Sequence, residues 1–337
     1  MRIAVDAMGG DFAPRRPVDG ALAAARHLGI GIDLVGRGAA IDAELVRHPD
    51  AEGLGVRVID APDVVAMEES AVQALRRKPR SSIMVAAARV ASGDAVALVS
   101  AGHTGGSVVA AHTLLGMLDG IDRPALAPVV PTGDGSAVLL DAGATVECRP
   151  QHLAQFALLG VSYARIALGH AQPRVGLLSI GEEPSKGNEL TREAFRLMQQ
   201  LPVTFVGNVE PRGLFEGAVD VAVADGFTGN LVLKMSEGVV EMVEALLKRE
   251  LQSTFSSQMG YLLSQRAFRR FRRRIDYSEY GGAPLLGVRG LVVVAHGRSS
   301  VKAMRNAVAQ AARLAAQGGW QRWQQEVSMP GGKDLPR

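Results

Sequence analysis

The chain has 337 residues, of which 47% are hydrophobic and 21% charged, and its formal net charge is only +3. This balance is typical of a folded protein with one large or two smaller domains, and it excludes a disordered or fibrous chain. The single cysteine, Cys148, excludes an internal disulfide and indicates a reducing cytoplasm. The chain opens on a strand-like pattern where a signal peptide would lie, and its longest apolar stretch, 107–118, is too short to cross a membrane.

Short apolar runs alternate with helical patterns along the first 120 residues. The pattern predicts strands at 3–6, 32–35, 56–59 and 95–99, and helices at 17–28, 41–46, 83–90 and after Gly106. Strands that alternate with helices are typical of an α/β fold with a mostly parallel sheet. The basic segment 76–80, RRKPR, is expected to be a solvated surface loop, and contact with an acidic partner is the alternative.

The second half continues the alternation with one difference. Strands are predicted at 128–131 and 136–140, and the short turn between them favours an antiparallel pair. Further strands are predicted from 177 and at 203–206, 219–224 and 291–295, and further helices at 150–168, 188–200 and 299–316. We therefore predict a Rossmann-like layered α/β sandwich with a mostly parallel, mixed sheet. Residues 1–316 are expected to form a single catalytic unit with a ligand cleft, followed by a polar, frayed tail at 317–337.

A long amphipathic segment interrupts this unit. Its apolar residues follow helical spacing from Leu231 to Leu251, a break is expected at 253–260, and the run RAFRRFRRR follows. We predict a projecting helical hairpin at 231–275, with an apolar seam that a second copy would cover in a four-helix bundle. The arginine run, at 266–274, could bind nucleic acid, an anionic membrane or an acidic protein. No nucleic-acid motif accompanies it, so we expect no nucleic-acid partner.

Four predicted strands run into a glycine-containing loop and then a helix, which is how α/β proteins present backbone N–H groups to an anion. These loops are 100–106, 181–188, 225–230 and 296–297. The first strand ends similarly, at Asp6, before two glycines. Structural alternatives exist for each loop, among them a tight turn at Asp6, a plain surface side chain for His103 and helix capping by Asn230.

The residue types exclude several catalytic classes. There is no G-x-S-x-G elbow, Cys148 has no obvious paired base, and the seven histidines show no metal-ligand spacing. We therefore expect neither a metal nor a cofactor. What remains is a set of anion-binding loops and a lysine, Lys186, beside a helix start at Asn188. Such a site suits a reaction in which a bound oxyanion is itself the nucleophile.

A series of long motifs occurs in order between Ile3 and Ala316. They are IAVDAMGGD, SAGHTGG, SIGEEPSKGNEL, GNVEPRGLFEG, DGFTGN with LVLKMSEG, and EYGGAPLLGVRG with HGRSS. In these motifs the chain resembles the bacterial phosphate acyltransferase family of phospholipid synthesis. The resemblance implies an enzyme that converts long-chain acyl-acyl-carrier protein and inorganic phosphate into acyl phosphate and free carrier.

The resemblance also implies a fold similar to that of phosphotransacetylases and isocitrate-type dehydrogenases. It further implies a homodimer joined at the hairpin and peripheral contact with the inner face of the cytoplasmic membrane. The next acyltransferase of the pathway is a further candidate partner.

The resemblance and the loop chemistry together assign roles to individual residues. Lys186 would neutralise the phosphate or the thioester oxyanion, and Asn230 would donate to the same centre. Phosphate or substrate contacts are expected from Asp6, Gly10, His103, Thr104, Gly105, Asn188, Asp225, Thr228, Gly229 and His296. Contacts with the carrier protein or the membrane are expected from Arg266, Arg269, Arg270, Arg273, Phe255, Met259, Tyr261 and Leu262, with the hairpin tip at 254–263.

Three positions depart from the family's pattern. The family has asparagine at the positions of His103 and Thr145, and glycine at the position of Pro211. Each replacement is small or can still form hydrogen bonds, so we expect the reaction to be unchanged.

Two other functions fit the same sequence. A phosphotransacetylase-like enzyme would combine the same fold and the same phosphate with a coenzyme A thioester. A non-enzymatic, anion-sensing protein that docks on membranes would explain the hairpin and the arginines, but it would leave the polar glycine loops without a role.

Overall fold

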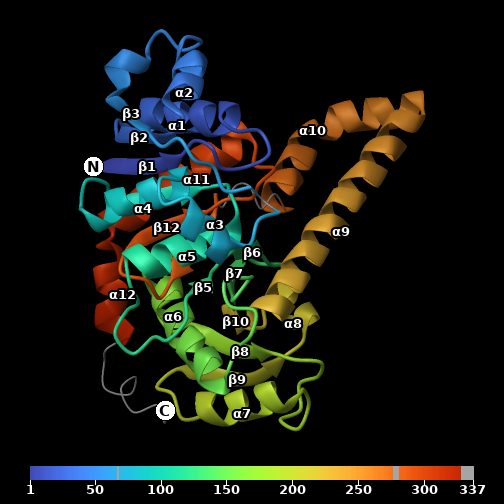
Figure 1. Ribbon diagram of the computed structural model, residues 1–337. Helices are drawn as coiled ribbons and strands as arrows, with labels where there is room; N and C mark the ends of the chain where they lie inside the picture. The colour runs from blue at the N-terminus through green and yellow to red at the C-terminus, as the bar shows by residue number, and fades with distance from the viewer. Residues whose placement is uncertain (67, 276–280, 328–337) are drawn as a thin grey trace.

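The computed structural model describes residues 1–66, 68–275 and 281–327, apart from the side chain of Arg273. Within these residues the strands form two sheets (Figure 1). The seven-stranded sheet has the order β3 (Val56–Asp60), β2 (Gly31–Gly36), β1 (Arg2–Asp6), β4 (Ala97–Ser100), β12 (Leu291–Val294), β11 (Ala283–Leu286) and β5 (Ala125–Leu126). The five-stranded sheet has the order β6 (Val129–Pro131), β7 (Ser136–Leu140), β10 (Val221–Val223), β8 (Arg174–Leu178) and β9 (Thr204–Val209).

Neighbouring strands are parallel except for the pairs β12–β11, β11–β5 and β6–β7. The predicted mostly parallel, mixed α/β fold is therefore confirmed, and the expected antiparallel pair is β6 with β7. The sheet that we described as one is divided into two, because β7 pairs with β10 and not with a strand of the first sheet. Apolar runs identify buried strands but do not specify their partners.

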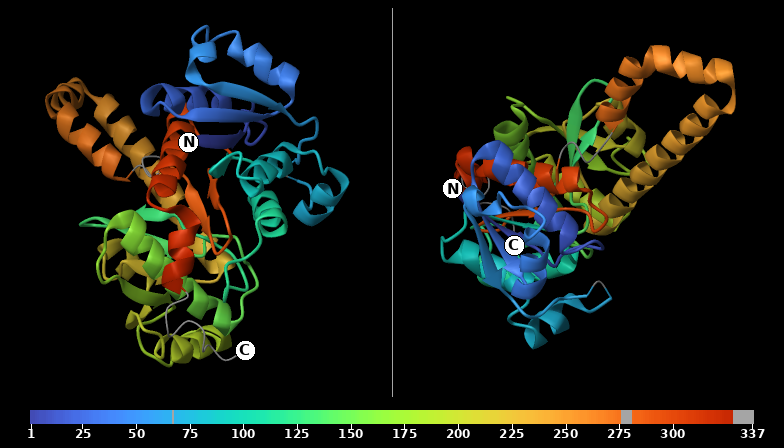
Figure 2. Two further views of the ribbon diagram at one scale, coloured as in Figure 1. Left: turned by 90° about the vertical axis from the view of Figure 1, so that its left-hand side faces the viewer. Right: turned by 90° about the horizontal axis from the view of Figure 1, so that it is seen from above.

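Helices cover both faces of the seven-stranded sheet (Figure 2). On one face α1 (Arg15–Leu28) packs beside α11 (Val301–Ala316), and on the other lie α3 (Ala71–Arg77), α4 (Ser82–Ala91) and α5 (Thr104–Leu114). Strand β1 shows why both faces are covered, since Ile3 and Val5 join the core on the α1 side and Ala4 joins the core on the α4 side. A strand that is covered on both faces carries apolar side chains on both of them, as the central residues of β1 do.

The remaining helices surround the five-stranded sheet or connect the strands. They are α2 (Gly38–Leu45), the 3₁₀ helix Ala51–Leu54, α6 (Pro150–Leu168), α7 (Glu189–Met198), α8 (Pro211–Glu216), α9 (Gly226–Ser253), α10 (Phe255–Ile275) and α12 (Gly319–Val327). Helix α6 packs on β7 and β10 and contacts both α7 and α12.

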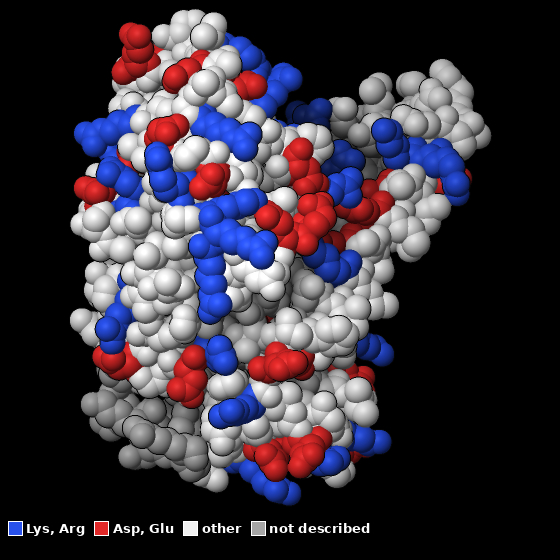
Figure 3. Space-filling model, viewed as in Figure 1, with Lys and Arg blue, Asp and Glu red and all other residues white. Residues whose placement is uncertain are grey.

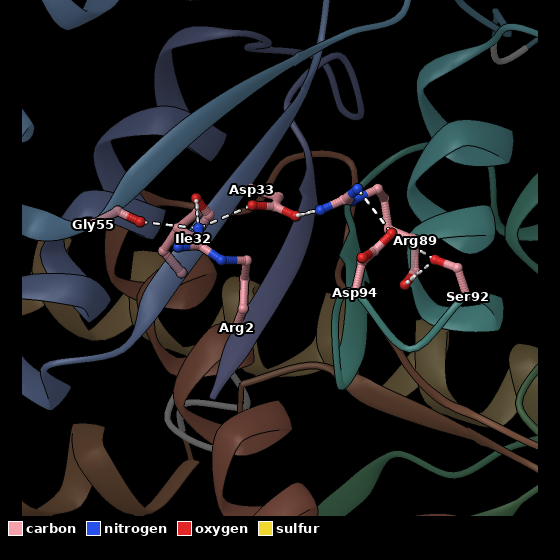
Figure 4. Close-up of polar contacts among 7 residues, drawn as sticks. All are labelled: Arg2, Ile32, Asp33, Gly55, Arg89, Ser92 and Asp94. Carbon is pink, nitrogen blue, oxygen red and sulfur yellow. Dashed lines mark hydrogen bonds and ion pairs between the residues drawn. The ribbon is translucent and has the colours of Figure 1, made fainter.

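A buried carboxylate ties three elements together at the amino end of the seven-stranded sheet (Figure 4). Asp33, in β2, is fully buried, and one of its oxygens lies 2.9 Å from Nη1 of Arg2, in β1. The other oxygen lies 2.9 Å from Nη2 of Arg89, in α4, which also pairs with Asp94. Arg2 donates further hydrogen bonds to the carbonyl oxygens of Ile32 and Gly55.

Helices α9 and α10 form the projecting hairpin (Figures 1 and 2). The break between them is a single residue, Thr254, whose hydroxyl accepts a hydrogen bond from the N–H of Ser257. The wider break predicted at 253–260 is therefore wrong, because this capping hydroxyl starts α10 at Phe255. The segment expected to be the tip, 254–263, is mostly the first turns of a helix.

The start of α9 also differs from the expectation. Helix capping was the structural alternative for Asn230, but Asp225 holds the N-cap position, with Oδ1 accepting from the N–H of Thr228 at 2.9 Å. Both residue types are good caps. The helix starts earlier because Gly226 and Gly229 allow its first turn to pack directly on the backbone near Asp141 and Thr145, where a Cβ would collide.

The end of the described chain is folded, whereas we expected a frayed tail from residue 317. Helix α12 packs on α6, and its Trp323 and Val327 are only 2% and 5% exposed. The ring of Trp323 meets that of Tyr163 edge-on, with centroids 6.3 Å apart. The remaining residues of α12 are mostly polar, so its narrow apolar side was overlooked. Residues 328–337 lie outside the described part of the chain.

Within the described residues, no helix combines the length and the apolar composition needed to cross a bilayer.

We predict that Asp33→Asn destabilises the fold by about 3 kcal/mol, because it leaves Arg2 and Arg89 without their shared counter-charge. The change would be measured as a shift in the urea unfolding midpoint. Asp94→Asn is the matched control, because the Asp94 side chain is 51% exposed and its ion pair with Arg89 should contribute less than about 1 kcal/mol. Equal effects of the two substitutions would contradict a structural role for the buried carboxylate.

Candidate functional site

The first group of candidate residues lies where β1 and β4 end. Asp6, the last residue of β1, is 3% exposed and accepts a 2.7 Å hydrogen bond from the hydroxyl of Ser100, the last residue of β4. The hydroxyl of Ser100 in turn accepts from the N–H of Gly102 at 3.0 Å. Burial raises the pKa of Asp6, although the hydroxyl and backbone donors around it act in the opposite direction. The carboxyl group therefore joins the two loops.

His103 is the N-cap of α5. Its Nδ1 accepts a 3.1 Å hydrogen bond from the N–H of Gly106, so in the neutral ring the proton is on Nε2. Asparagine, which the family resemblance leads us to expect at this position, is also a good cap. Among the described residues, no acceptor pairs with the N–H groups of Thr104 and Gly105 in this first turn. The turn therefore offers donors to an anion.

Asp6, Gly10 and His103 line one cavity of ≈ 150 Å³. Its other walls are largely apolar and come from Met8, Val64, Val65, Ala66 and Ile83. A small cavity with a few converging polar groups and apolar walls is typical of a ligand site. A larger cavity, of ≈ 790 Å³, lies at the opposite, amino end of the strands around Arg2 and contains none of the candidate residues.

His296 follows β12, and its loop lies against the loop after β1, because the N–H of Asp11 donates to the carbonyl oxygen of Gly297 at 2.9 Å. Loss of solvent contact around the ring and the positive charge of Lys234 lower the pKa of His296, although the residue as a whole is exposed. Lys234 belongs to α9, which starts after β10 of the five-stranded sheet. The charge of this helix therefore acts on a residue that follows β12 in the other sheet.

The second group of candidate residues lies where the five-stranded sheet ends. Strands β8 and β10 are parallel neighbours, so the loop that carries Lys186 and the loop that carries Asp225 leave the same edge. Lys186 is exposed, and its Nζ makes no hydrogen bond or ion pair with any described residue. Asn188 caps α7 as predicted, with its Oδ1 accepting from the N–H of Thr191 at 2.9 Å. No contact joins Lys186 to the cavity at Asp6 within the described part of the chain.

Asp225, Thr228 and Gly229 were expected to face phosphate, but their polar groups are used within the cap of α9. Both the N–H and the hydroxyl of Thr228 donate to the carboxylate of Asp225, and the N–H of Gly229 donates to its carbonyl oxygen. Asn230, by contrast, is exposed, and its side chain makes no hydrogen bond with a described residue. Among the polar side chains of this loop, residues 225–230, the amide of Asn230 is the one left free to meet a ligand.

Asn208 is a residue that the sequence reasoning missed. It is the next-to-last residue of β9, beside β8, is 8% exposed, and donates from Nδ2 to the carbonyl oxygen of Glu183 at 2.8 Å. It thereby holds the loop that carries Lys186. A buried amide at a strand end was the available signal, but the segment was interpreted only as a polar strand end.

Asp141 was also missed, although it is the most connected carboxylate near the site. It follows β7 and is fully buried, and its Oδ1 accepts from the N–H groups of Leu126, Gly143 and Ala144 at 2.6, 3.1 and 3.0 Å. Its Oδ2 accepts from the N–H of Thr145 at 2.6 Å. Leu126 belongs to β5 of the other sheet, so this carboxylate joins the two sheets.

The loop after Asp141 supports Asn230. A Cβ added at Gly143 would lie 3.6 Å from the Cβ of Asn230, and there is no room for one at Gly229 against the carbonyl group of Asp141. The hydroxyl of Thr145 donates to the carbonyl oxygen of Pro124 at 2.8 Å, so it stabilises this loop and does not face a ligand.

Cys148 lies in the same region. Burial raises its pKa to about 12, so it is a thiol at neutral pH and unsuited to act as a nucleophile.

The candidates on the hairpin lie apart from both groups. Arg266, Arg269 and Arg270 are exposed on α10, and the side chain of Arg273 lies outside the described residues. Phe255 and Leu262 are 78% and 62% exposed. Met259 and Tyr261 are exposed as well, with Tyr261 against Phe268.

Two sheets that carry anion-presenting loops at the carboxyl ends of their parallel strands define an α/β protein with a phosphotransacetylase-like fold. The structure is similar to EutD phosphotransacetylase from Staphylococcus aureus (TM-score 0.58) and to a phosphotransacetylase from Streptococcus pyogenes (TM-score 0.60), each 18% identical over 94% of both chains. A 4-hydroxythreonine-4-phosphate dehydrogenase from Klebsiella pneumoniae is also similar (TM-score 0.56, 16% identity, 94% of this chain and 99% of that one). At these identities the likeness concerns the fold alone.

The chain belongs to the family described as fatty acid synthesis protein, whose family model matches residues 1–322. Relatives from Geobacter sp. (strain M21) and Desulforudis audaxviator are 51% and 52% identical over 318 and 308 residues, which are 94% and 91% of this chain and 90% of each relative. A relative from Trichlorobacter lovleyi is 47% identical over all of this chain and 97% of its own. All three relatives are named phosphate acyltransferase.

We predict that the stability of the protein depends on the protonation of Asp141. Burial raises the pKa of this group from 3.8 to about 6, so the folded state binds the proton more tightly than the unfolded chain. The contribution of Asp141 to the free energy of unfolding is therefore largest in acid, and it is lost as the pH rises through about 6. Going from pH 7 to pH 5, the native protein should gain about 1 kcal/mol that Asp141→Asn cannot gain.

The measurement is urea unfolding of both proteins at the two pH values. Asp134→Asn, an exposed change in the turn between β6 and β7, is the control for general effects of pH. A difference between Asp141→Asn and the native protein that stays constant with pH would show that Asp141 does not titrate in this range.

Proposed function

We propose that this protein is a phosphate acyltransferase that transfers a long-chain acyl group from an acyl-carrier-protein thioester to inorganic phosphate. The observation that carries the proposal is that one chain has both a free N-terminal turn, that of α5, and an unpaired lysine, Lys186, and is about half identical to proteins named phosphate acyltransferase. The products are acyl phosphate, for glycerophospholipid synthesis, and the free carrier.

In the proposed reaction the phosphate is itself the nucleophile. The N–H groups of Thr104 and Gly105 and the Nε2–H of His103 hold it, and Asp6 keeps the loops after β1 and β4 in place. One phosphate oxygen attacks the carbonyl carbon of the thioester, and the negative charge moves to the carbonyl oxygen. The C–S bond then breaks, and the electron pair leaves with the carrier's sulfur as a thiolate, which takes a proton from solvent.

Lys186 and Asn230 act on the charge that develops. The ammonium group of Lys186 offsets the negative charge of the phosphate or the oxyanion, and the amide of Asn230 donates a hydrogen bond to the same oxyanion. The two residues leave the same edge of the five-stranded sheet, and both side chains are exposed. Asn208 and Asp141 hold the loops that carry them.

A phosphotransacetylase-like reaction, with a coenzyme A thioester as donor, is the second candidate, because phosphotransacetylases share the fold. The deciding assay offers each thioester in turn, with and without inorganic phosphate, and follows acyl phosphate. Phosphate-dependent product from the carrier thioester supports the proposal. Turnover with the coenzyme A thioester alone would favour the second candidate.

The proposal includes a homodimer and peripheral contact with the cytoplasmic membrane. Along α9, Met235 and Met242 are 68% and 55% exposed, and on the first turns of α10, Leu262 and Leu263 are 62% and 84% exposed. Monomeric proteins rarely expose apolar residues so continuously. A second copy would cover the α9 stripe, and lipid would take up the residues near the hairpin tip.

We predict that Lys186→Ala lowers turnover by about 10²–10³-fold while the melting temperature is nearly unchanged, because the exposed side chain makes no hydrogen bond or ion pair with a described residue. The rate of acyl phosphate formation and thermal unfolding would be measured together. Ser185→Ala is the control in the same loop and should leave the rate near normal. A near-normal rate in Lys186→Ala would overturn the assigned role.

For the hairpin, we predict that Met235→Asp with Met242→Asp gives monomers, while Leu262→Asp with Leu263→Asp gives dimers that no longer sediment with anionic vesicles. Light scattering and vesicle sedimentation measure the two properties. Monomers from the α10 pair, or retained vesicle binding by it, would contradict this division of the hairpin.

A further inference from the structure

A cluster of arginines lies at the end of α3, close to the cavity at Asp6. Arg76 and Arg77 end this helix, and Arg80 follows it. All three side chains are exposed, and Arg76 and Arg77 make no hydrogen bond or ion pair with any described residue. Arg80 has a single long contact, 3.7 Å to the exposed Asp60. In Figure 3 a band of Lys and Arg side chains runs down the middle of the face on which Figure 1 shows α3.

This arginine cluster is attached to the rim of the cavity. Lys78, between the arginines, donates to the carbonyl oxygen of Val64 at 2.8 Å and to Glu69 at 2.6 Å. Glu69 also accepts from the N–H of Ala66 at 2.8 Å. Val64 and Ala66 are wall residues of the cavity. The lysine and the glutamate therefore hold α3 and its arginines beside the cavity entrance.

The favourable interaction of positive charges with the helix dipole does not account for the arginine cluster. Positive charges in the last turn of a helix gain about 0.3–1 kcal/mol from the helix dipole. One paired arginine would give that gain without placing several exposed like charges together, which repel one another. Unpaired charges of one sign beside a cavity are instead what guides an oppositely charged partner to a site.

The arginines of α10 are less well placed for delivering a substrate. Two of them are already occupied, Arg269 by Gln265 at 2.7 Å and Arg272 by Glu244 at 3.0 Å. Their helix projects from the sheets and lines no part of the cavity (Figures 1 and 2). A thioester at the end of a carrier's flexible arm has to reach the cavity, and of these two arginine clusters the one on α3 lies next to it.

We propose that the carrier protein docks through an acidic surface on Arg76, Arg77 and Arg80, and that its thioester arm enters the cavity past Val64 and Ala66. This inference rests on the proposed function. The entrance suits the arm, because Val72, on α3, is 47% exposed and the cavity walls include Met8, Val65 and Ile83. An apolar path between a charged docking site and the polar groups at Asp6 and His103 fits the methylene segments of such an arm.

The test is a charge reversal, Arg76→Glu with Arg77→Glu. We expect the KM for the acyl-carrier protein to rise about tenfold or more with kcat unchanged, because the guiding charge acts on association. The dependence of KM on salt should also flatten. The matched control is Arg305→Glu with Arg313→Glu on α11, which lies on the opposite face of the sheet and should leave KM unchanged.

A carrier-free substrate separates docking from chemistry. The α3 variant should convert an acyl-pantetheine thioester at the native rate, because this substrate has no acidic surface. A loss of that rate would overturn the proposal by placing the arginines in the reaction site or in the fold.

Each of the remaining outcomes would overturn the docking proposal in a different way. An unchanged KM in the α3 variant overturns the docking site, as does a KM rise in a variant with Arg266, Arg269 and Arg270 reversed instead. Loss of binding to anionic vesicles with an unchanged KM also overturns it, in favour of a lipid surface. If the native protein itself shows no turnover of the acyl-carrier protein, the proposed function fails, and the docking proposal fails with it.

Discussion

The site depends on one buried carboxylate, that of Asp141. It accepts hydrogen bonds from the backbone of its own loop and from Leu126 in the other sheet, so the relative position of the two sheets is set where their strands end. The same loop supports the first turn of α9 through close contacts at Gly226 and Gly229. Hydrogen bonds from backbone N–H groups to a buried carboxylate are strong, and their geometry fixes the orientation of the loops that they join.

In the proposed reaction, this junction allows the chemistry to be divided between two sheets. The seven-stranded sheet would supply neutral donors: the free N–H groups at the start of α5 and the Nε2–H of His103. The five-stranded sheet would supply an exposed positive charge, Lys186, and the amide of Asn230. Neither set alone would both hold a phosphate and neutralise the charge that forms on a carbonyl oxygen. In the proposed reaction, the fixed N–H donors of α5 would hold the phosphate in place. The unpaired ammonium group of Lys186 would remain free to approach the oxygen on which the negative charge develops.

The fold class, the strand–loop–helix units and the cap at Asn188 could be predicted, because each depends on residues adjacent in the chain. What could not be predicted depends on contacts between distant residues. Asn230 and Asp225 are equally good caps by residue type, and only the packing of Gly229 against Asp141 decides between them. The division into two sheets depends on the pairing of β7 with β10, which no local pattern encodes. In α12 the buried side consists of little more than Trp323 and Val327, too few for a recognisable period.

Helix α9 runs without interruption from its cap at Asp225 to Ser253, a span of 28 residues. At 1.5 Å per residue it is a rod about 42 Å long. Asn230 lies near one end of this rod, and the turn into α10 lies at the other. Because a rigid helix turns through one angle along its whole length, a tilt at the far end would turn the near end equally, where Asn230 lies against the loop of Asp141. The turn of the hairpin and this amide are thus joined by one continuous helix.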